Sequence, residues 1–106
     1  MADTYSLVRQ AILDKHHVIG TYDGHYREMC PHVIGRNKEG RRQALFYQFA
    51  GTSRSGLGPD GSGRNWRCIP VDELGDITVR PGVWHSAPTH SRLQTCVAYV
   101  DVEVRF

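Results

Sequence analysis

The sequence predicts a mostly β fold, a small antiparallel barrel with one N-terminal helix and an extra C-terminal strand. Asp23-Gly24 stands between two segments with strand character, which is the strongest short signal for a β-hairpin. Further short segments, aromatic or alternating, follow at intervals typical of all-β domains. Helical spacing of apolar residues is confined to the N-terminus. The 106 residues suffice for one modest core, so we assign residues 1–106 to a single domain.

The N-terminal helix is expected over residues 6–14. Asp3 or Thr4 can cap it, because side-chain oxygens at this position accept hydrogen bonds from the first free backbone amides. Apolar residues then recur at helical spacing, at Leu7, Val8, Ala11 and Ile12. The helix is therefore expected to cover one end of the core.

The segments "HVIGTY" and "HYREMC" are the two arms of the predicted hairpin. With a two-residue turn, the facing pairs on one side are Val18 with Met29, Gly20 with Arg27, and Tyr22 with His25. The apolar members make this the core side. Arg27 is thus predicted to point inward, opposite a glycine that leaves it room. A buried guanidinium group needs a partner, either an internal carboxylate or an incoming anion.

More strands are expected downstream. "QALFYQFAG" reads as a third strand, "WRCIPVDEL" begins a fourth at Trp66, and "DITVRPGVW" contains a short fifth. Between the third and the fourth, the Gly-rich residues 52–65 have no apolar periodicity and predict a mobile loop. The C-terminal residues 94–106 alternate. This alternation places on one face Ala98, Val100, Val102, Val104 and Phe106.

The composition is that of an ordinary soluble domain, with 40% hydrophobic and 23% charged residues. No apolar run approaches the ~20 residues of a membrane span, and the N-terminus does not have the pattern of a signal peptide. We therefore expect a cytoplasmic protein with no membrane partner. Cys30, Cys68 and Cys96 form no CxxC pair and are interpreted as reduced thiols. The net charge of +2 is too small to indicate nucleic-acid binding by itself.

One order of motifs runs from residue 11 to residue 74. A helix is followed by a strand ending in Tyr, a turn, Arg-x-apolar-x-Pro-His, an aromatic strand, a Gly/Ser loop and a closing Trp-Arg segment. This order resembles the WYL-domain family. The matching positions are Tyr22, Arg27, Met29, Pro31, His32, Tyr47, Gln48, Trp66, Arg67, Ile69, Val71, Asp72 and Leu74. The literal Trp-Tyr-Leu triplet is replaced by "LFYQF", and residues 75–106 form an extension outside the pattern.

The resemblance implies an Sm-like β-barrel that acts as a regulatory sensor, and it implies no catalytic activity. Such domains bind ligands, and in several cases a nucleotide or single-stranded nucleic acid. The family usually occurs behind a helix-turn-helix, which is not readable in this chain, so a separate transcription regulator is an expected partner. We expect a monomer or a weak homodimer, with no cofactor and no metal.

The predicted site combines a phosphate-sized charge met by guanidinium groups with a base stacked on an aromatic ring. Its residues are Arg27, Arg67, His32, Tyr47 and Trp66, with Arg54 and Arg64 of the Gly-rich loop as further anion contacts. The structural alternative is that the aromatic residues belong to the core. In that alternative the two inner arginines form ion pairs with Glu28, Asp72 or Glu73.

Two other function classes remain open. "GDITVRPGVWH" comes within one residue of the second cupin metal motif, so His85 and His90 could serve a small metal-dependent enzyme, although the first cupin motif is absent. The alternating C-terminal strand could instead pair with another chain, as in an interaction module. Two weaker patterns are set aside. Residues 56–61 match GxGxxG without the helix that a dinucleotide site needs, and no signature supports a nucleophile pair at a cysteine.

Overall fold

The structure is a computed structural model. It describes residues 3–53, 56–59, 61–87 and 96–104. Its elements, in chain order, are α1 (Thr4–Asp14), β1 (His17–Tyr22), β2 (His25–Arg36), β3 (Arg42–Gly51), η1 (Gly63–Asn65), β4 (Trp66–Pro70), η2 (Val71–Glu73), β5 (Gly75–Arg80) and β6 (Tyr99–Glu103). The expected helix and the expected strands are thus all present.

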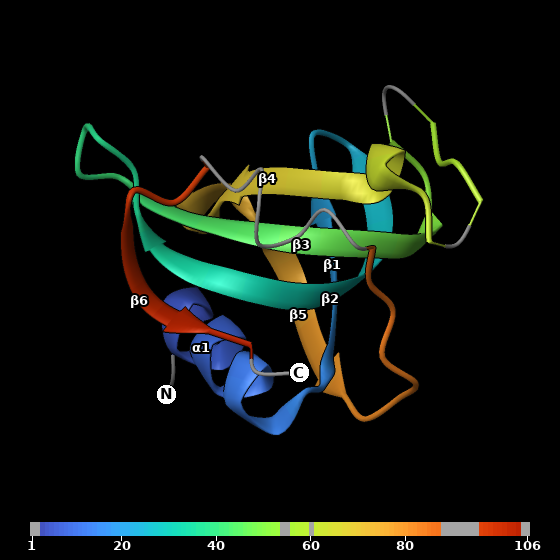
Figure 1. Ribbon diagram of the computed structural model, residues 1–106, viewed down its shortest axis with the longest axis horizontal. Helices are drawn as coiled ribbons and strands as arrows, with labels where there is room; N and C mark the ends of the chain where they lie inside the picture. Colours follow the sequence, from blue (N-terminus) through green and yellow to red (C-terminus); the bar gives the residue numbers. More distant parts are fainter. Residues whose placement is uncertain (1–2, 54–55, 60, 88–95, 105–106) are drawn as a thin grey trace.

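The strands form one antiparallel sheet in the order β4-β3-β2-β1-β5, and β6 pairs with β2 beyond the end of β1. The sheet curls strongly, so that β1 and β5 cross behind β2, β3 and β4 (Figure 1). No pairing joins β4 to β5 in the part of the chain that the structure describes. The mostly antiparallel β class is therefore confirmed, whereas the sheet is not closed into a barrel.

The β1–β2 hairpin has the predicted register. Gly20 lies opposite Arg27, and its neighbours on the same face pair as expected. Asp23 and Gly24 both have positive φ, 54° and 75°, as a type I′ turn requires. The role predicted for Gly20 is wrong, however. A Cβ there would lie 3.0 Å from the carbonyl oxygen of Gly75, so the glycine makes room for β5 and not for the arginine.

Helix α1 covers one end of the curled sheet, as predicted. Asp3 is its cap, and the carboxylate accepts a hydrogen bond from the Ser6 amide at 2.9 Å. Lys15 ends the helix in the left-handed conformation. The buried side chains of α1 belong to the main core, which lies inside the curl and consists of Val8, Ala11, Ile12, Val18, Met29, Ile34, Ala44, Phe46, Ile69, Val71, Leu74 and Val104.

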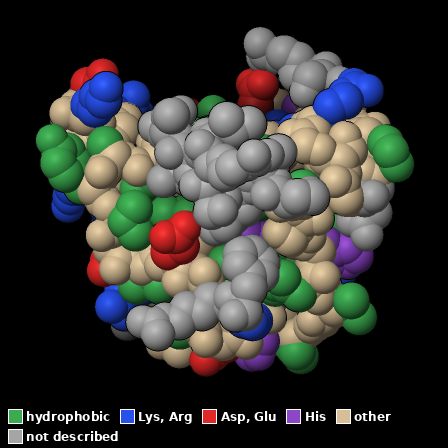
Figure 2. Space-filling view, in the orientation of Figure 1, with side chains coloured by type: hydrophobic (Ala, Val, Ile, Leu, Met, Phe, Trp, Pro, Cys, Tyr) green, Lys and Arg blue, Asp and Glu red, His purple; other side chains and the backbone are tan. Residues whose placement is uncertain are grey.

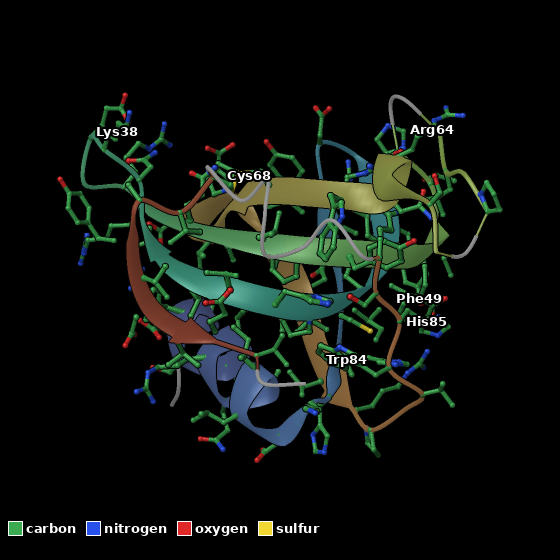
Figure 3. All side chains as sticks on the ribbon, viewed as in Figure 1. Lys38, Phe49, Arg64, Cys68, Trp84 and His85 are labelled. Carbon is green, nitrogen blue, oxygen red and sulfur yellow. A yellow bond between two sulfur atoms is a disulfide. The ribbon has the colours of Figure 1, made fainter. Side chains whose placement is uncertain are left out.

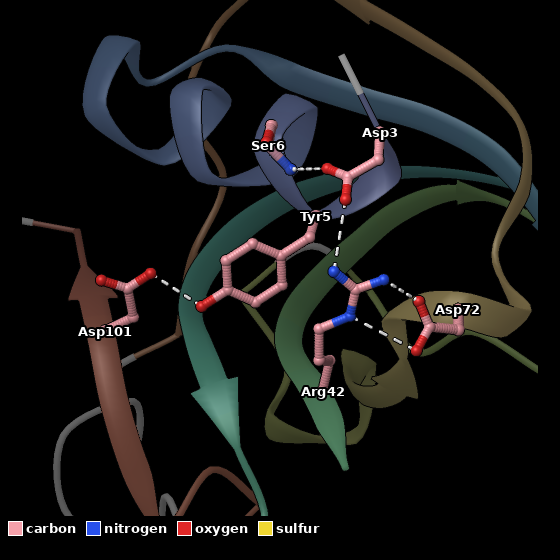
Figure 4. A network of polar contacts seen from close by, with 6 residues as sticks. All are labelled: Asp3, Tyr5, Ser6, Arg42, Asp72 and Asp101. Atoms are coloured by element: carbon pink, nitrogen blue, oxygen red, sulfur yellow. Dashed lines mark hydrogen bonds and ion pairs between the residues drawn. The ribbon is translucent and has the colours of Figure 1, made fainter. Parts of the chain in front are cut away.

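Polar contacts fasten α1 to the strands around it (Figure 4). The guanidinium group of Arg42 on β3 contacts both Asp72 of η2 and Asp3 at the start of α1. The Tyr5 hydroxyl donates to the Asp101 carboxylate of β6 at 2.7 Å. Burial, with that hydrogen bond as the second cause, raises the pKa of Tyr5 to about 12. The N-terminus, β3, η2 and β6 are thereby joined at one corner.

A second layer of apolar contacts lies on the outer face of the sheet, under the connection between β5 and β6. Cys30, Tyr47 and Ala87 form one buried cluster there. Val33, Leu45 and Val97 form another. Four residues of the connection, Trp84, Ala87, Cys96 and Val97, therefore pack on this face, whereas Val83 and Ala98 are exposed.

Cys68 of β4 and Cys96 of the connection form a disulfide, with their Cα atoms 6.0 Å apart. The interpretation of all three cysteines as reduced thiols is wrong for this pair. Tertiary packing brings together two residues separated by 28 positions, which spacing along the chain could not reveal. Cys30 is buried and is not part of this disulfide, and its sulfur accepts a hydrogen bond from the His85 amide at 3.3 Å.

The C-terminal strand is shorter than predicted, and its inward face differs. Val104 is buried, but Val100 is 48% exposed, and Val97 is buried instead of Ala98. The register between β2 and β6 shifts at Ile34/Gly35, and such a shift moves the following residues to the other face. Phe106 lies outside the described residues. Within the described ranges, no helix is both long and apolar enough to cross a membrane.

Candidate anion-binding site

Five of the seven predicted site residues separate into two groups on opposite faces of the sheet. In the β3–β4 register, Phe46 of the core faces Arg67, and Tyr47 faces Trp66. Neighbouring residues of a strand point to opposite faces, so Arg67 points into the curl and Trp66 points outward. Arg27 shares the inner face with Arg67. The outer group is His32, Tyr47 and Trp66; Arg64 belongs to η1, and Arg54 lies outside the described residues.

Arg27 is 4% exposed, and its contacts are with neutral groups. Its Nε and Nη2 each donate to the backbone carbonyl of Tyr22 at 3.3 Å. Its Nη1 donates to Oε1 of Gln48 at 3.2 Å. The guanidinium carbon lies 5.2 Å from the centre of the Tyr22 ring, within cation–π range. The inward orientation predicted from the hairpin is confirmed.

Arg67 reaches from β4 to the Gly-rich loop. Its Nη1 donates to the carbonyls of Arg64 and Trp66, and its Nη2 donates to Ser53 Oγ at 3.0 Å and to the Gly56 carbonyl at 2.8 Å. Its Nε is buried, and no acceptor among the described residues meets it. A buried donor without an acceptor costs free energy, about 1–3 kcal/mol.

Neither of the two inner guanidinium groups forms an ion pair with a carboxylate of the described residues. Burial lowers the pKa of Arg27. Burial also lowers the pKa of Arg67, with the positive charges of Arg27 and Arg64 as the next causes. The attraction of Asp23 acts on the pKa of Arg27 in the opposite direction and is smaller than the effect of burial. The inner face therefore carries excess positive charge.

The internal ion pairs that sequence reasoning offered as an alternative are not formed. Each of the three carboxylates in question binds a different arginine at the surface. These pairs are Glu28 with Arg80, Glu73 with Arg41, and Asp72 with Arg42. The structural alternative is thus wrong for Arg27 and Arg67, although it is right that Tyr47 is buried on an apolar face.

The described part of the Gly-rich loop is organised around one buried side chain, Asn65. Its Oδ1 accepts from the Gly58 amide at 2.8 Å, and its Nδ2 donates to the carbonyls of Gly58 and Pro59. From the outer face, the Tyr47 hydroxyl donates to the Ser62 carbonyl at 2.9 Å. These residues of the predicted mobile loop therefore have internal hydrogen bonds. Its mobility stays a prediction.

The aromatic residues that were predicted to stack on a base pack against one another instead. His32 is fully buried, with its ring centre 4.8 Å from that of Trp66 and 5.0 Å from that of Trp84. Tyr47 meets Trp66 edge to face at 5.0 Å. A single stacking platform beside the two arginines is therefore not found. The sequence alone could have shown this, because Trp66 and Arg67 are adjacent in a strand and adjacent residues of a strand point to opposite faces.

A shallow depression of about 420 Å³ lies beside the hairpin turn, on the other side of Tyr22. Its lining includes the acidic residues Asp23 and Glu73. These carboxylates repel an anion, so the depression is not part of the arginine site. On the face seen in Figure 2, the Lys and Arg side chains of the described residues are dispersed and form no single basic patch.

The histidines of the alternative cupin reading do not form a metal centre among the described residues, where no group of three His, Cys, Asp or Glu side chains comes together. His85 stacks on Phe49, with ring centres 4.2 Å apart and an interplanar angle of 13° (Figure 3). His90 lies outside the described residues.

Comparison of the chain with known protein families, characterised proteins and solved structures gives no match. The resemblance to the WYL-domain family therefore stays a prediction.

Proposed function

We propose that this protein is a regulatory ligand-binding module that takes up an anion, a nucleotide or a short single-stranded nucleic acid, at Arg27 and Arg67. The observation that carries the proposal is that the buried Arg27 and the half-buried Arg67 share the inner face, where the charge of Arg27 helps lower the pKa of Arg67, and that no described carboxylate is in ion-pair contact with either. One anionic group between them would supply the missing counter-charge.

Hydrogen-bond capacity supports the same ligand class. Within the described ranges Arg27 donates to a backbone carbonyl and an amide oxygen alone, and Nε of Arg67 has no acceptor there. Bonds from guanidinium to phosphate oxygens are shorter and roughly twice as strong as bonds between neutral groups. A phosphate can therefore recruit donors that are only weakly used in the free protein.

An aromatic contact for a base would come from Tyr22 and not from Trp66. Tyr22 is half-buried, and its ring already lies against Arg27. In this proposal the open curled sheet is a variant of the Sm-like barrel. The ligand-bound protein then acts on a separate transcription regulator in the cytoplasm. Disulfides are uncommon in the cytosol, so a cytoplasmic location predicts that the Cys68–Cys96 bond responds to the redox state of the cell.

The test is an NMR titration with inorganic phosphate, a nucleotide and a short oligonucleotide, in parallel with Arg27→Met. Methionine keeps the apolar stem without the charge. We expect amide shifts around Tyr22 and Gln48 in the parent protein, and binding weakened by roughly 1–3 kcal/mol in the variant. Arg36→Met is the matched control, because Arg36 also donates to a backbone carbonyl but is exposed on a hairpin. Equal binding by both variants, or no shifts with any ligand, would refute the proposal.

One observation favours a second function, that of a protein-interaction module. Strand β6 pairs with β2 along one edge, and its first residues Tyr99 and Val100 are 66% and 48% exposed. Exposed apolar residues on an outer strand are a common basis for strand addition. Sedimentation of the parent protein and of Tyr99→Ser tests this function. A monomer at all concentrations, unchanged by the substitution, would exclude self-association through β6.

A further inference from the structure

The outer face of the sheet brings together a serine and a histidine that are 54 positions apart in the chain. Ser86 is half-buried in the connection after β5, and its Oγ lies 3.1 Å from Nε2 of His32 on β2. No local sequence motif predicts this pair, because the two residues meet only when the connection folds back over β2. The pair has the separation expected for a nucleophile and its base.

The hydrogen bonds fix the roles of the two imidazole nitrogens. Nδ1 of His32 lies 2.8 Å from the carbonyl oxygen of Cys30. A carbonyl only accepts, so Nδ1 carries the proton in this contact and Nε2 of the neutral ring is an acceptor. The Ser86 hydroxyl therefore donates to His32. The backbone carbonyl takes the orienting place that a carboxylate has in the usual triad.

The surroundings suit proton transfer to His32. The ring is buried between Trp66 and Trp84, and indole rings at about 5 Å stabilise a cation such as the imidazolium that forms. Trp84 also supplies a donor, because its buried Nε1 has no acceptor among the described residues. The Trp84 ring packs against His32, so this unused donor lies on the ring next to the proposed base, and such a donor can serve a developing oxyanion.

We propose that Ser86 is a nucleophile for small activated carboxylic esters, with His32 as its general base. Oγ of Ser86 attacks the ester carbonyl carbon while its proton passes to Nε2 of His32. The C–O bond to the alcohol breaks, and the alcohol leaves with that proton. Water, deprotonated by His32, then attacks the acyl group, which releases the carboxylic acid and restores the serine. This site lies on the face opposite Arg27 and Arg67, so it is independent of the anion site.

The experiment is incubation of the whole protein with p-nitrophenyl acetate. We expect a burst of p-nitrophenol stoichiometric with protein, and peptide mass spectrometry should find the acetyl group on Ser86. Ser86→Ala should lose the burst completely. Ser62→Ala is the matched control and should keep it, because among the described residues the Ser62 hydroxyl has no histidine partner and accepts from the Arg64 amide. An acetyl group confined to lysines or to the N-terminus, or an equal burst from Ser86→Ala, would overturn the proposal.

Ser86→Cys keeps the proposal falsifiable if the alanine variant does not fold. A thiol placed beside His32 should form a thiolate–imidazolium pair. It should then react with iodoacetamide at pH values well below about 8.5, the pKa of an ordinary thiol. The buried thiol of Cys30, present in the parent protein, gives the background rate. A pH profile of alkylation with its midpoint at or above the ordinary value would contradict the assigned role of His32.

Discussion

Arg27 and Gln48 form a buried hydrogen bond, 3.2 Å from Nη1 to Oε1, at a position where an ion pair would be expected. The amide nitrogen of Gln48 then donates to the carbonyls of Ala50 and Thr52, both at 3.0 Å. Gln48 is fully buried. It therefore connects the arginine to the start of the Gly-rich loop without neutralising it, and the positive charge of Arg27 is left for another group.

Gln48→Glu is expected to abolish anion binding. The new carboxylate would lie beside Arg27, form the ion pair that the protein lacks, and compete with any phosphate. The free energy of unfolding should change little, because the ion pair offsets the lost hydrogen bonds to the two carbonyls. Phosphate titration and thermal melting measure the two effects. Gln43→Glu on the same strand is the control, and an undiminished phosphate affinity in Gln48→Glu would show that Arg27 does not hold the anion.

Asn65→Ala is expected to release the Gly-rich loop. The substitution removes three hydrogen bonds between a buried amide and Gly58 or Pro59, so we expect a loss of about 1–3 kcal/mol in the free energy of unfolding. Backbone order parameters of residues 56–59 should fall in the variant. They also decide whether the loop of the parent protein is mobile, as its composition predicts, or held by Asn65. Equal order parameters in both proteins would mean that Asn65 does not control the loop.

Cys96→Ser is expected to destabilise the fold by about 2–4 kcal/mol, the usual contribution of a disulfide that closes a loop of a few tens of residues. Chemical denaturation measures the change. Dithiothreitol serves as the control, because it should lower the stability of the parent protein and leave that of the variant unchanged. A parent protein that is insensitive to the reductant would contradict a contribution from this bond.

Acid should weaken the corner where Arg42 meets Asp3 and Asp72. The backbone hydrogen bond from Ser6, followed by smaller effects that include Arg42, lowers the pKa of Asp3 below 3.8. The hydrogen bond from Arg42 lowers the pKa of Asp72 in the same direction. Because the folded state holds these carboxylates ionised, their contribution is present above pH 3.8 and is lost as the pH falls through the folded-state values.

Arg42→Gln should therefore reduce the pH dependence of stability below pH 4. Urea denaturation at a series of pH values gives the slope. Arg41→Gln is a suitable control, since Arg41 forms its ion pair with the exposed Glu73 and is only the smallest of the causes that lower the pKa of Asp72. Parallel slopes for all three proteins would show that the corner does not contribute to acid sensitivity.

The sequence was most informative where one local signal determined geometry. Asp23-Gly24 fixed the turn type, the turn fixed the register, and the register placed Arg27 inside. The alternation of side chains along a strand predicts that Trp66 and Arg67 point to opposite faces. The resemblance to the family nevertheless placed both residues in one predicted site. What local pattern could not provide depends on distant contacts. The bond between Cys68 and Cys96 and the contact between Ser86 and His32 both require the connection after β5 to fold over the outer face.

The disulfide also gives the chain a topological property. Residues 68–96 form a covalent ring that contains β5, and β6 follows directly after it. A protease that cuts once between residues 69 and 95 would leave two fragments that still migrate as one molecule until a reductant is added. The backbone of this protein can thus be opened in that region without separating its N-terminal strands from the C-terminal strand.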